Sequence, residues 1–168
     1  YKNNSSVNLP FKTDSFQYWS SSLIKYSKSS KLESEIKYWK NICDQDVQLI
    51  SKNDINVNSN IEESTNVSFT LGKEITSLLQ SKVHNVYNTE INDILLTGLA
   101  IALKNTFGIE RSILKMEGHG REEIIKKVDV SRTIGWFTTI YPHLLRIDSN
   151  DALENLVNIK ESLRKIPN

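Results

Sequence analysis

The spacing of apolar residues predicts a chain that mixes helices with short strands. Apolar side chains recur every three to four residues, which is the helical period, over 14–28, 30–43, 73–84, 90–106 and 151–165. Apolar runs or alternation predict strands over 66–71, 111–116 and 136–147, the last one interrupted or bent at Pro142. This pattern favours an α/β fold, most simply a two-layer α/β sandwich.

Polar residues at the predicted helix starts give further detail. Asp14 and Asp151 are expected to cap the first and last helices, and Ser30–Glu33 has the pattern of a capping box. The helix over 90–106 carries apolar residues nearly all the way round, which predicts burial on several sides. The tract 51–66 is rich in Asn, Ser, Asp and Glu, and it predicts a surface loop rather than a domain boundary.

Composition excludes several classes of function. The chain has 168 residues, with 21 Lys and Arg against 20 Asp and Glu, so its net charge of +1 offers no nucleic-acid footprint. No apolar stretch approaches the roughly 18 residues that cross a bilayer, so no membrane partner is expected. The single cysteine, Cys43, is expected to be a partly buried spectator, and such usage fits a reducing, cytoplasmic setting. The three histidines show no ligand spacing, so no metal site is predicted.

Residues 116–122 carry the densest candidate chemistry. Glu117 ends an apolar run, and Gly118 and Gly120 allow other groups to approach the backbone closely. A partly desolvated carboxylate suits proton abstraction next to a carbonyl, provided that something stabilises the enolate. The alternative for Glu117 is a structural carboxylate, paired with Arg121 or Arg132.

Other polar and aromatic residues nearby also have two interpretations. His119 is a base, a hydrogen-bonding group or a structural residue, and a structurally satisfied histidine is favoured. Arg121 clamps an anion or forms a buried ion pair, and the ion pair is favoured because a buried guanidinium needs a partner. Trp136, Phe137 and Tyr141 line a pocket or pack in the core, and for Phe137 core packing is favoured.

Two segments resemble signature motifs of epimerization domains from nonribosomal peptide synthetases. Residues 117–122 are similar to the family's Glu-Gly-His-Gly-Arg-Glu motif without a change. Residues 132–138, followed by Tyr141-Pro142, resemble Arg-Thr-Val-Gly-Trp-Phe-Thr, with Ile134 in place of Val. Asp93–Leu99 resembles a weaker helical motif, and Leu9–Phe16 resembles the segment that joins the family's two lobes. The match is collinear along nearly the whole chain.

The resemblance implies a fold like chloramphenicol acetyltransferase. Residues 1–12 would be the inter-lobe linker, and residues 13–168 the C-terminal lobe, truncated before its last strands. Glu117 would be the catalytic acid or base, working opposite a histidine on the other lobe. Its structural or supporting residues would be His119, Arg121, Gly118 and Gly120, with Trp136 and Tyr141 at the pocket. Arg121 matches an arginine that, in related domains, holds the aspartate of the histidine motif.

The resemblance also implies an activity and its partners. The family inverts the α-carbon of an aminoacyl or peptidyl thioester in antibiotic biosynthesis. The substrate is carried on the phosphopantetheine of a peptidyl carrier protein, and no cofactor is bound directly. Partners would be this carrier, the N-terminal lobe and neighbouring synthetase domains. The family's His-His-x-x-x-Asp-Gly motif is absent from these residues, so the isolated chain is expected to be an inactive isomerase fragment.

Two alternatives stay open at this point. One is a condensation domain that forms amide bonds, against which the runs 117–120 and 136–138 argue. The other is a non-catalytic module that only docks a carrier protein.

Overall fold

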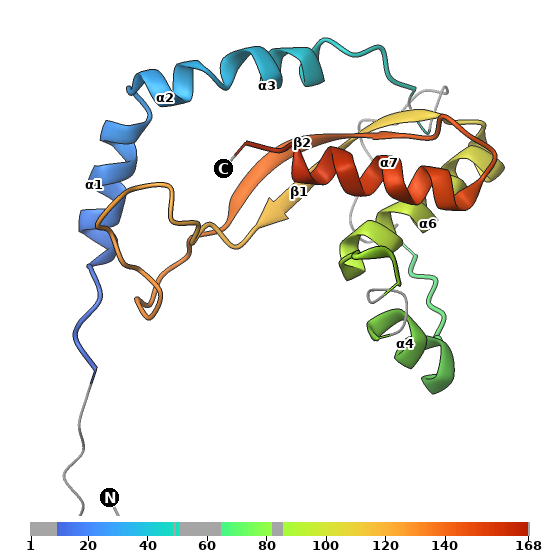
Figure 1. The fold of residues 1–168 in the computed structure, drawn as a ribbon, viewed down its shortest axis with the longest axis horizontal. Helices are drawn as coiled ribbons and strands as arrows, with labels where there is room; N and C mark the ends of the chain where they lie inside the picture. The colour runs from blue at the N-terminus through green and yellow to red at the C-terminus, as the bar shows by residue number, and fades with distance from the viewer. Residues whose placement is uncertain (1–9, 49, 51–64, 82–85, 168) are drawn as a thin grey trace, which may run out of the picture. The chain divides into compact units, whose positions relative to one another are not determined.

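The structure is a computed structural model that describes residues 10–48, 50, 65–81 and 86–167. Its elements are α1 (Phe16–Tyr26), α2 (Ser30–Glu33), α3 (Ile36–Cys43), α4 (Lys73–Gln80), α6 (Ile91–Phe107), β1 (Arg111–Gly118), β2 (Thr139–Arg146) and α7 (Ala152–Arg164) (Figure 1). The chain divides into two compact units. The first contains residues 1–41 and 116–141, and the second contains residues 42–115 and 142–167.

β1 and β2 pair in a two-stranded sheet. The strands are antiparallel, because the Ile147 N–H donates to the Glu110 carbonyl at 3.0 Å beyond one end while Gly118 meets Thr139 at the other. β2 passes through Pro142 without a break, so of the two expectations, an interruption or a bend, the interruption is wrong. A proline lacks an N–H, but a strand of a two-stranded sheet has an open edge where that group is not needed.

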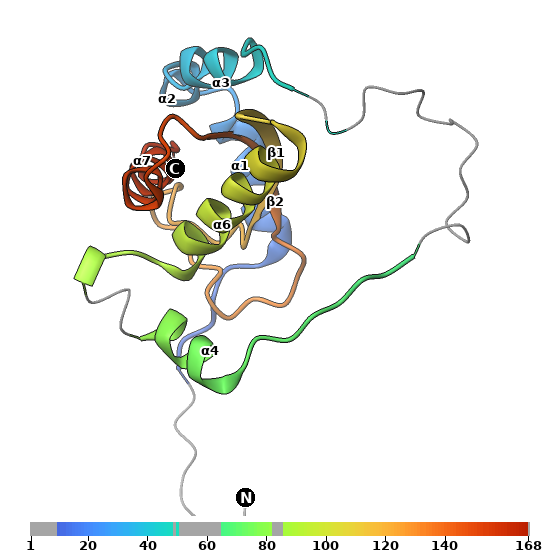
Figure 2. The same cartoon turned by 90° about the vertical axis from the view of Figure 1, so that its right-hand side faces the viewer.

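The core of the second unit lies where α6, α7 and β2 meet. α7 lies alongside α6 in both views (Figures 1 and 2). The fully buried members of the apolar cluster are Ala100, Leu103, Ile109, Leu145, Ile147 and Ile159. Helices therefore pack on the strands, as the predicted α/β sandwich requires.

Helix α6 matches its predicted bounds but not its predicted burial. Its start has a capping box formed by Glu90 and Asp93, and Gly108 ends it in the left-handed conformation. Asp93, Thr97, Ala100 and Leu103 are buried, whereas Leu95 and Leu99 are exposed. Within the described residues, only one side of the helix is therefore covered, and the predicted burial on several sides is wrong for this chain.

The helix caps confirm one prediction and correct another. Asp151 caps α7, and its carboxylate accepts from the Leu153 N–H at 2.9 Å, as predicted. At α1 the cap is Ser15, whose hydroxyl accepts from the Tyr18 N–H at 3.1 Å. Asp14 lies one residue too early for that role, and its carboxylate accepts a hydrogen bond from Asp129 instead.

The predicted helix over 30–43 divides into α2 and α3. Its N-cap is Ser29, and Ser30 already lies inside α2, so the predicted capping box is wrong. The Ser34 hydroxyl donates to the Lys31 carbonyl at 2.6 Å, and such side-chain bonds compete with continuation of a helix. Cys43, at the end of α3, is exposed rather than partly buried.

The predicted strand over 66–71 is extended but unpaired. Figure 2 shows residues 65–72 as a smooth trace that leads into α4, and Val67 and Phe69 are exposed. A strand needs neighbouring backbone groups, and no described segment pairs with this one. α4 ends at Gln80, residues 82–85 lie outside the described residues, and so does most of the predicted loop over 51–66. Among the described helices, none is long and apolar enough to cross a membrane.

Candidate functional site

Glu117 occupies the penultimate position of β1. The strand extends two residues beyond its predicted end, and Glu117 is exposed while Met116 and Gly118 on either side are half-buried. The described chain therefore does not desolvate this carboxylate, and the prediction of partial burial is wrong for it. Within the same residues no ion pair joins Glu117 to Arg121 or Arg132, so this carboxylate is open to groups from outside the chain.

Arg121 is held by carbonyl groups and an aromatic ring. Its guanidinium donates to the carbonyl oxygens of Val130 and, at 2.9 Å, of Thr133. The same group lies 4.0 Å from the centre of the Phe137 ring, a cation–π distance. The favoured ion pair is therefore not formed within the described chain. Arg121 instead fastens the first motif to the loop that carries the second.

Three glycines of the two motifs lie where the backbone closely approaches another segment. Gly120 has φ of +68°, and a Cβ there would lie 1.5 Å from the Phe137 carbonyl oxygen. A Cβ on Gly135 would lie 2.5 Å from the Phe16 ring, and one on Gly118 would lie 2.9 Å from the Thr139 hydroxyl oxygen. Gly120 is the strictest position because a backbone group, which cannot swing aside, fills the space.

Phe137 of the second motif belongs to an aromatic cluster with two residues of α1. Phe137 is buried, and its ring centre lies 5.2 Å from that of Phe16 and 4.8 Å from that of Trp19, both edge-on. Such contacts stabilise a fold beyond simple burial. The favoured core role of Phe137 is confirmed.

His119 is hydrogen-bonded but open to solvent. Its Nδ1 accepts from the Arg121 N–H at 3.0 Å, and its side chain is 72% exposed. The Glu122 carboxylate lies 3.7 Å from the same nitrogen. Because Nδ1 accepts, the neutral ring carries its proton on Nε2. The hydrogen bond fits the favoured structural histidine, but the role of His119 stays a prediction, and Gly118 and Gly120 do not bury the side chain.

The two predicted pocket residues differ in their surroundings. Trp136 is 83% exposed, whereas Tyr141 is half-buried and its ring centre lies 6.4 Å from that of Trp39 in α3. Burial, assisted by the nearby Tyr141, raises the pKa of Tyr38 on the same helix. A separate cavity of about 110 Å³ lies between Trp19 and residues 121–131, and neither Trp136 nor Tyr141 lines it.

A set of hydrogen bonds that sequence reasoning missed ties the segment before α1 to the second motif. We call it the clasp, and it joins Phe11–Asp14 to Asp129–Thr133. Asp14 and Asp129 exchange two bonds: the Asp14 N–H donates to the Asp129 carbonyl at 2.7 Å, and the Asp129 N–H donates to the Asp14 carboxylate at 2.9 Å. The Thr133 hydroxyl donates to the Asp14 carbonyl at 2.6 Å, and Arg132 donates to the Phe11 carbonyl.

Further contacts stiffen the clasp. The hydroxyl oxygens of Thr13 and Thr133 lie 2.8 Å apart. Hydrogen bonds from the Ser131 backbone and side chain lower the pKa of Asp129, and Arg132 adds to this effect. The clasp joins positions more than 110 residues apart, so no local spacing could have predicted it; its only signal was that both segments matched family motifs.

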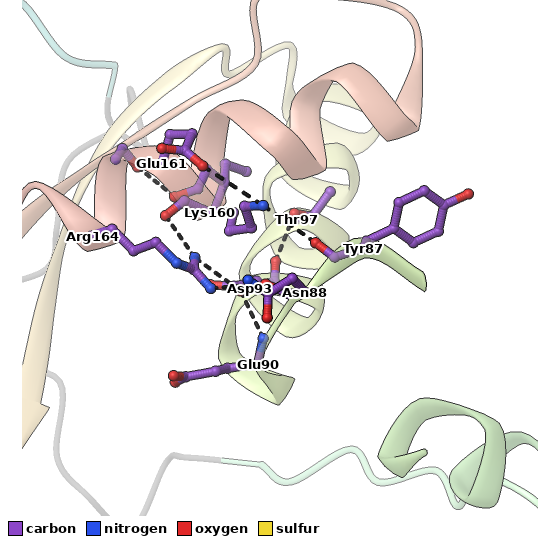
Figure 3. Close-up of polar contacts among 10 residues, drawn as sticks. Tyr87, Asn88, Glu90, Asp93, Thr97, Lys160, Glu161 and Arg164 are labelled. Carbon is purple, nitrogen blue, oxygen red and sulfur yellow. Dashed lines mark hydrogen bonds and ion pairs between the residues drawn. The ribbon is translucent and has the colours of Figure 1, made fainter. Parts of the chain in front are cut away.

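The weaker helical motif belongs to a polar network in the second unit (Figure 3). The Asp93 side chain is 4% exposed, and its carboxylate accepts from the Glu90 N–H at 2.8 Å and from Arg164 at 3.3 Å. Arg164 also donates to the Asn88 carbonyl at 3.1 Å, while Lys160 donates to the Tyr87 carbonyl at 3.2 Å. Asp93 therefore starts α6 and fastens it to the last turn of α7.

The comparisons with known proteins agree with this arrangement of motifs. A family model described as "Condensation domain" matches residues 1–168. The chain belongs to the condensation-domain family. Bacitracin synthase 3 from Bacillus licheniformis is 44% identical over 163 residues, which are 96% of this chain and 3% of that protein. Gramicidin S synthase 1 from Brevibacillus brevis is 42% identical over 165 residues, 96% of this chain and 15% of that protein.

A solved structure has the same fold as this chain. The crystal structure of the epimerization domain from the third module of tyrocidine synthetase B matches with a TM-score of 0.86 and 36% identity. The match covers 98% of this chain and 37% of that one. The chain thus has the α/β lobe, like chloramphenicol acetyltransferase, that the motifs predicted, and it spans a small part of its synthetase relatives.

Proposed function

We propose that this chain is part of an epimerization domain. The domain would invert the α-carbon of an aminoacyl or peptidyl thioester held on the phosphopantetheine of a peptidyl carrier protein. The observation that carries the proposal is the likeness, over 98% of the chain, to a solved domain that is itself an epimerization domain. The motif at 117–122 supports it, because it supplies a carboxylate at the end of a strand.

Glu117 is the proposed acid or base. The neighbouring thioester carbonyl acidifies the α-proton, so a carboxylate can remove it and leave an enolate. A second acid, on a lobe outside this chain, returns a proton to the opposite face of the same carbon. The configuration is then inverted, and the two groups regain their protonation states by exchange with water. Glu117 is exposed in this chain, so a substrate and a second lobe can reach it, and these groups would have to supply the desolvation that raises its basicity.

The surrounding motif residues would hold this carboxylate still. Gly120 lets the chain turn against Phe137, and Arg121 fixes the turn through the Val130 and Thr133 carbonyls. Preorganisation of this kind matters because a catalytic group must stand within reach of the proton before the reaction starts. These residues therefore support the site without touching the substrate.

The test is Glu117→Gln in a complete domain together with its carrier protein. General acid–base groups typically contribute about 10²–10⁴-fold in rate, or roughly 3–5 kcal/mol of barrier. Inversion, measured by chiral analysis of the released amino acid, should fall by this factor. Glu123→Gln is the matched control, because Glu123 is exposed on the loop that follows β1 and has no polar partner among the described residues. Inversion at the full rate by Glu117→Gln would refute the assignment.

Amide-bond formation is the second candidate, favoured by the description of the matching family model. The same complete domain, supplied with donor and acceptor carriers, separates the two reactions. Release of an elongated peptide without inversion would support condensation, whereas inversion without elongation would support epimerization.

A further inference from the structure

We propose that Asp14 is a positioning residue for Glu117, and that it acts through the clasp. This inference rests on the proposed function of Glu117. Asp14 lies 103 positions earlier in the sequence and belongs to the segment before α1, outside both signature motifs. Its influence would pass along a chain of contacts that lies wholly within the first unit.

The first step is from Asp14 to the loop of the second motif. Asp14 uses three groups: its N–H, its carbonyl and its carboxylate contact Asp129 or Thr133 at 2.6–2.9 Å. Three bonds from one residue fix both the distance and the direction of the loop. The pair of opposed bonds between Asp14 and Asp129 also prevents the two segments from sliding past each other.

The second step is from the loop to Arg121. Thr133 donates its hydroxyl proton to Asp14 and accepts, at its carbonyl, from the Arg121 guanidinium. Val130, next to Asp129, supplies the other carbonyl that Arg121 contacts. The clasp therefore fixes the positions of the Val130 and Thr133 carbonyls, which accept from the Arg121 guanidinium.

The third step is from Arg121 to Glu117, a separation of four residues. The backbone between Arg121 and Glu117 has little conformational freedom, because Gly120 lies in close contact with the Phe137 carbonyl and Gly118 belongs to β1. A shift of Arg121 must therefore be taken up at the end of the strand, where Glu117 stands. A misplacement of about 1 Å in a catalytic group can lower a rate by roughly 10²-fold.

The test compares Asp14→Ala with Asp14→Asn in the complete domain with its carrier protein. Alanine removes the carboxylate that accepts from Asp129, whereas asparagine keeps an oxygen that accepts the same N–H. We expect alanine to lower kcat for inversion about tenfold with KM nearly unchanged, and asparagine to stay within about twofold of the native rate. Asp44→Ala is the control, since Asp44 is exposed and has no polar partner among the described residues.

Exchange of the α-hydrogen for deuterium separates positioning from simple loss of folded protein. Each acid–base group serves one face, so Glu117→Gln should slow exchange from one stereoisomer more than from the other. Asp14→Ala should show the same inequality, in the same sense and to a smaller extent. Equal slowing of both stereoisomers, or a rate equal to that of the Asp44 control, would overturn the inference. If Glu117→Gln itself shows no loss, the proposed function fails instead.

Discussion

Replacement of Arg164 by Met is expected to loosen the contact between α6 and α7. Met keeps an unbranched apolar side chain but removes the guanidinium that bonds to Asp93, Asn88 and the Lys160 carbonyl. The Asp93 carboxylate, 4% exposed, would keep its bond from the Glu90 N–H and lose its charged partner. The structure therefore predicts a local effect, centred on the start of α6 and the end of α7.

The magnitude follows from the burial of the two partners. Leaving a buried acceptor unsatisfied costs about 1–3 kcal/mol, and breaking a fully buried ion pair costs about 3–5 kcal/mol. The Arg164 side chain is 38% exposed, so water screens the pair and can replace part of its bonding. We therefore expect Arg164→Met to lower the free energy of local opening by about 2 kcal/mol, which lies inside the range for an unsatisfied buried acceptor. This loss corresponds to a roughly thirtyfold change in the opening equilibrium.

Native-state hydrogen exchange of the complete domain measures this effect directly, because it reports the free energy of local opening. Amides of α7 and of the first turns of α6 should lose about 2 kcal/mol of protection in Arg164→Met. Arg146→Met is the matched control, since Arg146 pairs with Asp148 at 2.8 Å on the surface and such pairs contribute about 0–1 kcal/mol.

A double-mutant cycle with Asp93→Asn completes the argument. Asparagine keeps an acceptor for the Glu90 N–H but removes the charge that Arg164 faces. Arg164→Met should therefore cost clearly less in the Asp93→Asn background than in the native one. Equal costs in the two backgrounds, or an effect no larger than that of Arg146→Met, would refute the reasoning.

Two further predictions concern single buried positions. Gly120→Ala should abolish the packing of residues 119–138, because the added Cβ would overlap the Phe137 carbonyl. Gly98→Ala is the control: a Cβ there meets no neighbour within 4 Å in the middle of α6, so the variant should be neutral or more stable by up to about 1 kcal/mol. Equal urea midpoints for the two variants would contradict this prediction. Burial lowers the pKa of His143 in the folded protein. As the pH falls through the ordinary histidine range, the unfolded chain therefore protonates at this residue before the folded chain does, and the free energy of unfolding decreases. His143→Leu should flatten that acidic loss in urea titrations of the complete domain, and parallel pH curves for the two proteins would show that another group is responsible.

Some features of this protein follow from local sequence alone. The helical periods located α6 and α7, and the Asp151 cap was predicted correctly, because helix formation and capping depend on residues within one or two turns. The apolar run over 111–116 likewise predicted that Glu117 lies near the end of a strand, because the residue pattern of a strand is also local.

Only the tertiary structure decided the environment of the candidate site. Arg121 found two carbonyls and the Phe137 ring in place of a carboxylate, and Asp14 became part of the clasp instead of a cap. Glu117 stayed exposed, and residues 66–71 stayed unpaired, because neither has a covering partner among the described residues. These outcomes depend on groups that lie far away in the sequence or outside the described residues. Local periodicity carries no information about such groups, since it reports only which side of an element prefers to be buried.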